Sequence, residues 1–119
     1  MKILIVDDEA MTRRMAQMIL EKAGNDCLMA DSGMAALEIL KQEKVDLVLM
    51  DVEMPQMSGL QTLEEIRKSD WGREQKVVLM SGTIDEAVQN AKQNQGVIDC
   101  IQKPFKVPDL QGMLEKVNN

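Results

Sequence analysis

Short hydrophobic segments recur along the chain and alternate with longer amphipathic segments. The hydrophobic segments lie at residues 2 to 6, 26 to 30, 46 to 50, 76 to 80 and 98 to 102. The amphipathic segments lie at residues 11 to 23, 34 to 42, 59 to 68, 84 to 93 and 107 to 117. Continuous hydrophobic segments of this length are typical of strands buried on both faces of a parallel sheet. The pattern therefore predicts five strands, each followed by a helix.

Each predicted helix carries its hydrophobic residues on one side. In the first helix the spacing selects Met11, Met15, Met18 and Ile19, and we expect the methionines to fill the core. One-sided helices cover a sheet, and right-handed crossovers between parallel strands place them on both of its faces. The predicted fold class is therefore α/β: a doubly wound, five-stranded parallel sheet. Of the common doubly wound strand orders we adopt 2-1-3-4-5, the flavodoxin-like order, as our expectation.

The length and charge of the chain limit the class of protein. With 119 residues it is long enough for one domain, spanning residues 1 to 119, and too short for two. Fourteen Lys and Arg against twenty Asp and Glu give a net charge of −6 without a basic stripe, so we expect no direct binding to nucleic acid. The hydrophobic segments are too short to span a membrane, and Met1-Lys2 leads directly into a strand. We expect a cytoplasmic protein with no membrane partner.

The two cysteines, Cys27 and Cys100, lie in the second and fifth predicted strands. In the expected order these strands form opposite edges of the sheet, about 19 Å apart at a strand spacing of about 4.8 Å. A disulfide needs Cα atoms within about 7 Å. We therefore expect both cysteines to be reduced and buried.

Polar residues stand at the carboxyl ends of the predicted strands. They are Asp7 and Asp8 after the first strand, Asp51 after the third, Ser81 after the fourth and Lys103 after the fifth. The carboxyl ends of parallel strands meet at one edge of the sheet, and ligands bind there, where the strand order reverses. The sequence therefore predicts a single polar site at this edge.

Three carboxylates within a few ångströms need a compensating cation or a raised pKa, because two like charges about 4 Å apart repel by roughly 4 kcal/mol at a surface-like dielectric. Oxygen ligands without histidine or cysteine favour Mg²⁺ or Mn²⁺ over zinc. A hard metal, Lys103 and the Ser81 hydroxyl suit a phosphoryl group. A carboxylate can itself attack phosphorus, and Asp51 is the best candidate because it ends the central strand.

Four motifs in the correct order give the chain a family resemblance. They are Val6-Asp7-Asp8-Glu9, Met50 through Gly59, Ser81-Gly82 and Lys103-Pro104-Phe105. With them the chain resembles, from end to end, the response-regulator receiver domains, the phosphoacceptor modules of two-component signalling. The resemblance implies that Asp51 receives a phosphoryl group from a phosphohistidine on a sensor histidine kinase or histidine phosphotransfer protein. It implies no enzyme activity beyond the domain's own phosphorylation and dephosphorylation.

The same resemblance implies a Mg²⁺ ion held by Asp8, Asp51 and the main-chain carbonyl of Glu53, with Asp7 acting largely through water. Ser81 occupies the switch position, where its hydroxyl would turn towards a phosphoryl oxygen.

The remaining contacts implied by the resemblance surround the phosphoryl group. The backbone N–H groups of Val52 and Gly82 would bind its oxygens, and Lys103 would pair with its charge. The side chains of Glu53 and Thr83 stand where the family tunes hydrolysis of the acyl phosphate.

One position departs from the family pattern. The aromatic residue that usually precedes the lysine by three positions and rotates inward with the switch hydroxyl is Cys100 here. A small thiol cannot fill or vacate the same volume. We expect the signal to pass instead through the loop from Ser81 to Ile84 and the fourth helix alone.

The output surface is expected next to the switch. The fourth helix, the fifth strand and the fifth helix would bind an output protein or domain, or another copy of the domain as a homodimer. The polar residues expected on this face are Asp85, Gln89, Lys92 and Lys106. The chain would act as a stand-alone regulator or as the receiver part of a longer regulator or hybrid kinase.

Three alternative functions fit parts of the sequence. A flavodoxin-like electron carrier shares the strand order, but it needs a phosphate loop after the first strand and aromatics beside a flavin, and Trp71 and Phe105 are the only aromatics. An aspartyl-nucleophile phosphatase carries Asp-x-Asp, whereas Glu53 stands at the second position. A pseudo-receiver would bind partners without phosphorylation, which the intact site argues against.

Overall fold

The computed structural model describes residues 1 to 118 and confirms the predicted architecture. The strands are β1 (Lys2–Val6), β2 (Asp26–Ala30), β3 (Leu47–Asp51), β4 (Val77–Ser81) and β5 (Asp99–Gln102). The helices are α1 (Ala10–Lys22), α2 (Gly33–Gln42), α3 (Gly59–Lys68), α4 (Glu86–Asn94) and α5 (Val107–Asn118). The strands pair in parallel in the order β2-β1-β3-β4-β5, as predicted. Residue 119, which the predicted domain includes, lies outside the described residues.

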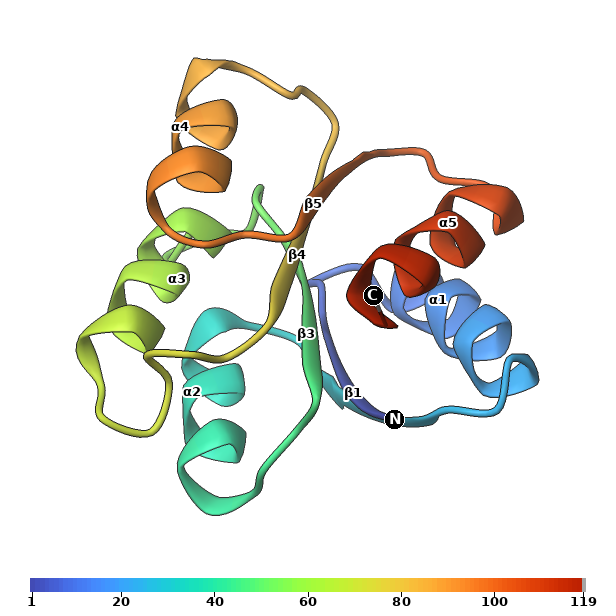
Figure 1. The fold of residues 1–119 in the computed structure, drawn as a ribbon, viewed down its shortest axis with the longest axis horizontal. Helices are drawn as coiled ribbons and strands as arrows, with labels where there is room; N and C mark the ends of the chain where they lie inside the picture. The colour runs from blue at the N-terminus through green and yellow to red at the C-terminus, as the bar shows by residue number, and fades with distance from the viewer. Residues whose placement is uncertain (119) are drawn as a thin grey trace.

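The sheet separates two layers of helices. α1 and α5 cover one face, and α2, α3 and α4 cover the other (Figure 1). Because successive strand residues point to opposite faces, Ile3 and Ile5 join the core beneath α1 and α5, while Leu4 and Val6 join the core on the other side. β3 and β4 are buried along their whole length. This double burial explains why the strands are hydrophobic throughout rather than at alternate positions.

The first helix packs on the sheet with a different side from the one predicted. Met11, Met15 and Met18 are 83%, 50% and 66% exposed, whereas Ala16 and Leu20 are fully buried. The prediction that these methionines fill the core is therefore wrong. Moving one residue along a helix turns the side-chain direction by about 100°. Ala16 lets α1 approach the sheet closely, and the methionines form the neighbouring exposed side.

Several element boundaries differ from the prediction by one or two residues. Asp51 and Ser81 are the last residues of β3 and β4 rather than the first residues after them. α4 begins later than predicted, because the Asp85 carboxylate accepts a hydrogen bond from the Val88 N–H at 3.0 Å and caps the helix. Residues 82 to 85 consequently form a loop between the end of β4 and α4.

The cysteines lie on opposite edge strands, Cys27 on β2 and Cys100 on β5, and both are free thiols, as predicted. They are half-buried rather than fully buried. Burial raises the pKa of Cys27 to about 11 and also raises the pKa of Cys100. Both thiols are therefore protonated at neutral pH, which keeps them weak nucleophiles.

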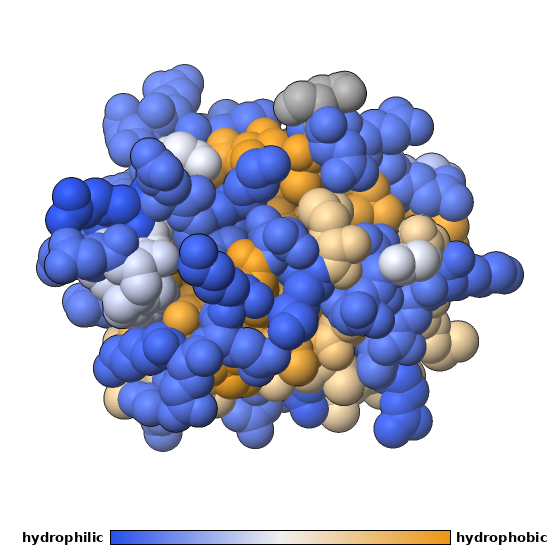
Figure 2. Space-filling model, turned by 60° about the horizontal axis from the view of Figure 1, so that its bottom comes forward, coloured by the Kyte–Doolittle hydropathy of each residue, from blue (hydrophilic) through white to orange (hydrophobic). Residues whose placement is uncertain are grey.

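The face of the molecule seen in Figure 2 is mostly polar. In the view of Figure 2, hydrophilic side chains cover most of the face, and hydrophobic side chains show between them in separate patches. Within residues 1 to 118, no helix combines the length and the hydrophobicity that a membrane span requires.

Gly59 fixes the start of α3 against the end of β3. Its N–H donates to the main-chain carbonyl of Val52 at 2.9 Å. A Cβ atom at this position would overlap the carbonyl oxygen of Asp51. The absence of a side chain therefore lets α3 begin directly against the strand end that carries Asp51.

Gly59→Ala tests this close approach. We expect the variant to lower the free energy of unfolding by about 1 to 3 kcal/mol, because main-chain atoms cannot yield to an added methyl group. Gly112→Ala is the matched control, since a Cβ at Gly112 in α5 meets no atom within 4 Å. That variant should stabilise the protein by up to about 1 kcal/mol through helix propensity. Urea denaturation of both variants measures the difference, and equal effects would contradict the close approach.

Candidate functional site

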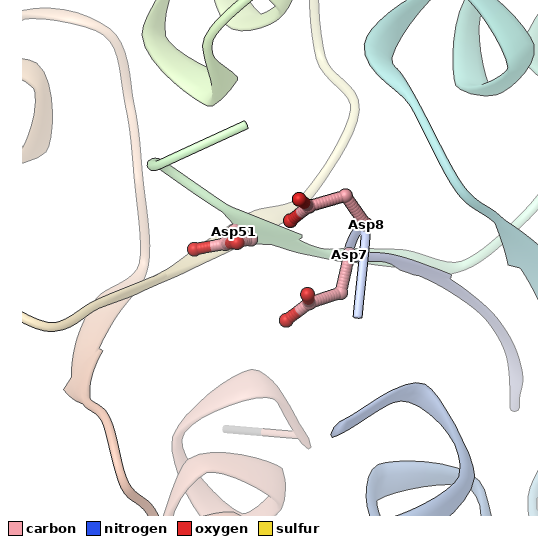
Figure 3. Close-up of side chains that lie close together, drawn as sticks. All are labelled: Asp7, Asp8 and Asp51. Atoms are coloured by element: carbon pink, nitrogen blue, oxygen red, sulfur yellow. The ribbon is translucent and has the colours of Figure 1, made fainter. Parts of the chain in front are cut away.

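Three carboxylates meet at the carboxyl ends of β1 and β3. Asp7 and Asp8 directly follow β1, and Asp51 is the last residue of the neighbouring strand β3. One ligand oxygen from each lies within 4.8 Å of the other two (Figure 3). The structure thus brings together the three acidic residues that the sequence selected.

Lys103 reaches the same point from the end of β5. Its Nζ lies 2.9 Å from Asp7 Oδ2 and 3.3 Å from Asp51 Oδ2. Asp7 is fully buried and Asp51 is 1% exposed, whereas Asp8 is exposed. Lys103 is therefore the one cation that the two buried carboxylates share, which leaves one negative charge uncompensated, and Asp8 remains open to solvent.

The surroundings raise the pKa of Asp51 from 3.8 to about 6. Burial is the main cause and the neighbouring charge of Asp7 adds to it, while Lys103 and the Glu53 N–H oppose it. Burial also lowers the pKa of Lys103, but its hydrogen bond to Asp7 and the charge of Asp51 outweigh that effect and raise it overall. At neutral pH Asp51 is ionised and Lys103 is charged, so Asp51 presents a carboxylate nucleophile.

Ser81 and Gly82 contact Glu53 rather than Asp51. Ser81 is fully buried, and its hydroxyl lies 2.5 Å from Glu53 Oε2. The Gly82 N–H donates to Glu53 Oε1 at 2.7 Å. The Thr83 N–H donates to Ser81 Oγ at 3.1 Å, and Thr83 itself is exposed. The predicted switch residues therefore lie beside the carboxylates but are held by Glu53.

The role predicted for the Val52 N–H requires correction. This group donates to Met80 O at 2.8 Å as part of the ladder between β3 and β4, so it is not free to bind a phosphoryl oxygen. The next N–H, that of Glu53, donates to Asp51 Oδ1 at 3.2 Å. Because β3 continues its pairing to its last residue, the first N–H that turns towards the site belongs to Glu53.

An open cleft of about 480 Å³ lies over this site. Its lining combines polar groups with a hydrophobic wall and comprises Glu9, Thr12, Met15, Asp51, Glu53, Gly82, Lys103, Pro104 and Phe105. Trp71 instead lines a separate cavity with Met1 and Lys76, at the amino ends of the strands. Of the two aromatic residues, only Phe105 borders the cleft, so no aromatic pair is available to enclose a flavin.

Two residues that sequence reasoning missed hold Asp7 in place. The Glu9 N–H donates to Asp7 Oδ1 at 2.9 Å, and the Arg13 guanidinium donates to the main-chain carbonyl of Asp7 at 2.7 Å. Glu9 Oε1 also lies 3.7 Å from Lys103 Nζ. A basic residue one helical turn after Glu9 was the available signal for Arg13. These contacts fix the loop between β1 and α1 around the buried carboxylate.

Cys100 lies on the edge strand β5, at the position where the family usually has an aromatic residue. It is half-buried and packs against the core beneath α2, α3 and α4. The preceding Asp99 places one carboxylate oxygen 3.8 Å from Lys92 Nζ and the other 3.1 Å from Lys116 Nζ. Charge pairs therefore connect α4 and α5 across β5.

The donor set fits a hard divalent cation. Three carboxylate groups converge, and neither His nor Cys belongs to the group. Mg²⁺ and Mn²⁺ prefer carboxylate, carbonyl and water oxygens, and they offset the repulsion that raises the pKa of Asp51. Exposed Asp8 and the open cleft leave room for waters and for an anionic ligand.

Comparison with known proteins places these residues in context. The sequence model of the response regulator receiver domain matches residues 3–115. The probable C4-dicarboxylate response regulator DctR of Bacillus subtilis is 32% identical over 117 residues, which are 97% of this chain and 51% of DctR. The sensor protein ArcB of Escherichia coli is 37% identical over 119 residues, which are 98% of this chain and 15% of ArcB. The chain thus spans about half the length of DctR and 15% of the length of ArcB.

The chemotaxis protein CheY of Thermotoga maritima is 36% identical over 118 residues, which cover 98% of this chain and 97% of CheY. Among solved structures, CheY4 of Vibrio cholerae superposes with a TM-score of 0.89 at 25% identity, covering 98% and 97% of the two chains. The response regulator TrrA of Thermotoga maritima, in complex with Mg²⁺-BeF, superposes with a TM-score of 0.84 at 28% identity, covering 98% and 97%.

Asp51→Asn tests the electrostatic strain of the site. In metal-free protein at pH 8 we expect the free energy of unfolding to rise by about 2 to 3 kcal/mol, because the variant removes a charge whose pKa burial raises from 3.8 to about 6. Folded Asp51 holds its proton more tightly than unfolded Asp51, so wild-type stability relative to the variant falls as pH rises from about 4 to about 6. Denaturant titrations at pH 4 and pH 8 measure this.

At pH 4 folded Asp51 is protonated and unfolded Asp51 is only partly ionised, so most of the advantage of the variant should be lost. Well below pH 4 Asp51 is protonated in both states, and the advantage should disappear. Asp70→Asn is the control, because the Asp70 side chain is 94% exposed, and it should give no comparable gain at pH 8. An Asp51→Asn protein that is no more stable than wild type at pH 8 would contradict the assignment.

Proposed function

The chain belongs to the response regulator receiver domain family, and we propose that it accepts a phosphoryl group on Asp51 from a phosphohistidine of a partner protein. Receiver domains of two-component systems occur in response regulators and in the hybrid kinase ArcB, and phosphoryl transfer is the role of the family. The family assignment replaces the flavodoxin-like and phosphatase alternatives, and the intact acidic site argues against a pseudo-receiver. The observation that carries the proposal is the position of Asp51, beside two further carboxylates and Lys103 at the floor of an open cleft.

Asp51 is the acceptor because it is the only one of the three aspartates that lines the cleft. Asp7 is fully buried, and its two carboxylate oxygens are occupied by the Glu9 N–H and Lys103. Asp8 is exposed and lies outside the contacts of Lys103. A phosphohistidine entering the cleft therefore meets the Asp51 carboxylate, with Lys103 beside it.

The transfer exchanges one bond at phosphorus. An oxygen of Asp51 bonds to phosphorus while the bond from phosphorus to the histidine nitrogen breaks, and the electron pair of that bond stays on the imidazole. The ammonium group of Lys103 lies next to the oxygens on which negative charge accumulates. The Glu53 N–H, which already faces Asp51, is placed to bind one of these oxygens.

Asp8, Asp51 and the main-chain carbonyl of Glu53 would hold Mg²⁺ or Mn²⁺, with Asp7 acting through water. The cation supplies charge neutralisation for the carboxylates and the phosphoryl oxygens. The solved structure of TrrA with Mg²⁺-BeF supports the same use of this site. Glu53 and Thr83 would set the hydrolysis rate of the acyl phosphate.

The partners follow from this chemistry. The donor is a sensor histidine kinase or a histidine phosphotransfer protein, and the domain catalyses no reaction other than its own phosphorylation and dephosphorylation. We place residues 1 to 119 in one receiver domain acting in the cytoplasm. The domain acts as a stand-alone regulator or as part of a longer regulator or hybrid kinase.

The output surface is α4, β5 and α5. The loop at residues 82 to 85 connects the site directly to α4, and the Asp99 carboxylate joins Lys92 on α4 to Lys116 on α5. A shift of the loop therefore changes the positions of both helices relative to β5. With Cys100 in place of an aromatic residue, these polar links carry the signal to an output partner or a second copy.

Phosphorylation can be measured directly. Incubation with Mg²⁺ and acetyl phosphate should add one phosphoryl group to the intact protein by mass spectrometry, stable in acid and lost in base. Asp51→Asn should gain none, because no other carboxylate of the acidic group faces the cleft. Asp31→Asn, at an exposed aspartate that follows β2, serves as the control and should be phosphorylated like wild type. A folded wild-type protein that gains no phosphoryl group from any donor would overturn the proposed function.

The cation site has a separate test. Titration with MgCl₂ should raise the melting temperature at pH 8, because the cation binds only the folded arrangement of carboxylates. Asp8→Asn should weaken Mg²⁺ binding at least about tenfold, since it removes one anionic ligand. Asp31→Asn should leave the affinity unchanged. An identical Mg²⁺ response in Asp8→Asn and wild type would exclude Asp8 as a ligand.

A further inference from the structure

The Glu53 side chain spans the site and holds two groups of the loop that follows β4. Its Oε2 lies 2.5 Å from the Ser81 hydroxyl, and its Oε1 accepts the Gly82 N–H at 2.7 Å. We call these two hydrogen bonds the Glu53 bridge. Both join a charged acceptor to a neutral donor, which makes them stronger than ordinary hydrogen bonds.

We propose that the Glu53 bridge is an internal stand-in for the phosphoryl group, which keeps Ser81 and Gly82 occupied until phosphorylation displaces it. The proposal rests on the proposed function, in which these two donors bind phosphoryl oxygens. A carboxylate offers two anionic oxygens, as a phosphoryl group does. Glu53 is therefore a positioning residue. The bridge sets the binding free energy that the phosphoryl group must supply before the domain switches.

The Ser81 hydroxyl cannot bind a phosphoryl oxygen and keep both of its present acceptors. It has one proton, and its described acceptors are Glu53 Oε2 and the Thr83 carbonyl oxygen at 2.6 Å. Its oxygen meanwhile accepts the Thr83 N–H at 3.1 Å. Because Ser81 is fully buried, no bulk water replaces a lost partner. The hydroxyl can reach a phosphoryl oxygen only by giving up an existing acceptor.

The bridge also ties two different segments. Glu53 follows β3, whereas Ser81 and Gly82 end β4 and begin the loop that leads to α4. Glu53 and Gly82 both line the cleft above Asp51. Breaking the bridge therefore frees the start of the loop at the place where the phosphoryl group arrives. A ligand shifts a conformational equilibrium only by the difference between its affinities for the two states. Here the two states are the bridged and the unbridged site, and the free energy of the bridge reduces the shift that the phosphoryl group can produce.

The first measurement needs no phosphoryl group. In metal-free, unphosphorylated protein, we expect Glu53→Ala to shift the Gly82 amide resonance and to increase its hydrogen exchange several-fold, because the N–H loses its acceptor. Glu64→Ala, at an exposed glutamate on α3, is the matched control and should leave this amide unchanged. An unchanged Gly82 amide in Glu53→Ala would show that the bridge does not form in solution and would overturn the proposal.

The second measurement uses beryllofluoride, a phosphoryl mimic, with Mg²⁺. Calorimetric titration should show about tenfold tighter binding to Glu53→Ala than to wild type, the gain expected from removing one charged competitor. In a Ser81→Ala background the same change should gain only about threefold, because one donor is already absent. If the bridge only stabilises the loop and does not compete with the mimic, Glu53→Ala should bind beryllofluoride as tightly as wild type or more weakly. This result would overturn the proposal.

Two further variants separate the bridge from simple charge repulsion. Glu53→Asp keeps the negative charge but shortens the side chain by about 1.5 Å, so it cannot reach both donors. It should therefore bind the mimic nearly as tightly as Glu53→Ala. If Glu53→Asp binds the mimic as wild type does while Glu53→Gln binds it more tightly, charge repulsion is the cause and the bridge is not.

The proposed function and the bridge can fail separately. If no variant binds the mimic and wild type also gains no phosphoryl group from acetyl phosphate, the proposed function fails, and the Gly82 amide still decides whether the bridge exists.

Discussion

Like charges held together at a buried sheet edge are the constraint on which the whole site depends. Asp7 and Asp51 are almost fully buried, and lost hydration, with the charge of Asp7 as a second cause, raises the pKa of Asp51 to about 6. A single ammonium group, Lys103 Nζ, lies within ion-pair distance of both. Such an arrangement costs stability, because desolvation of buried charges is only partly recovered by pairing. The same cost makes the site reactive, since one cation shared by two carboxylates leaves strong affinity for a further cation.

The sheet topology supplies the proximity that this chemistry needs. β1, β3, β4 and β5 are neighbours in that order, so residues separated by up to 96 positions in the sequence meet at their carboxyl ends. The fold then adds local restraints around each group. Gly59 lets α3 start against the main chain of Asp51, and Arg13 and Glu9 hold the loop that carries Asp7. Rigid strands thus set the distances between the charges, and loops supply the groups that move.

Features that follow from burial along a whole segment could be predicted from the sequence, whereas features that depend on a single local contact could not. Strand order and the meeting of Asp7, Asp8, Asp51 and Lys103 followed from hydrophobic segments and from their polar ends, which report burial directly. The buried side of α1 did not follow, because methionine suits both core and surface and a shift of one residue chooses another side. The engagement of the Val52 N–H and the bridge from Glu53 depend on where one strand stops pairing and where one flexible side chain folds back. Neither leaves a periodic pattern in the sequence.

In its resting arrangement the site satisfies its polar groups internally. Lys103 pairs with both buried carboxylates, and Glu53 accepts hydrogen bonds from Ser81 and Gly82. Each internal contact must be weakened or replaced when an external phosphoryl group enters, so the free energy available for switching is the difference between two sets of charged hydrogen bonds. With a thiol at Cys100, no large ring at this position adds packing energy to either state. On the proposed function, the strength of the internal contacts, and not the number of phosphoryl contacts alone, would therefore set how completely the domain switches.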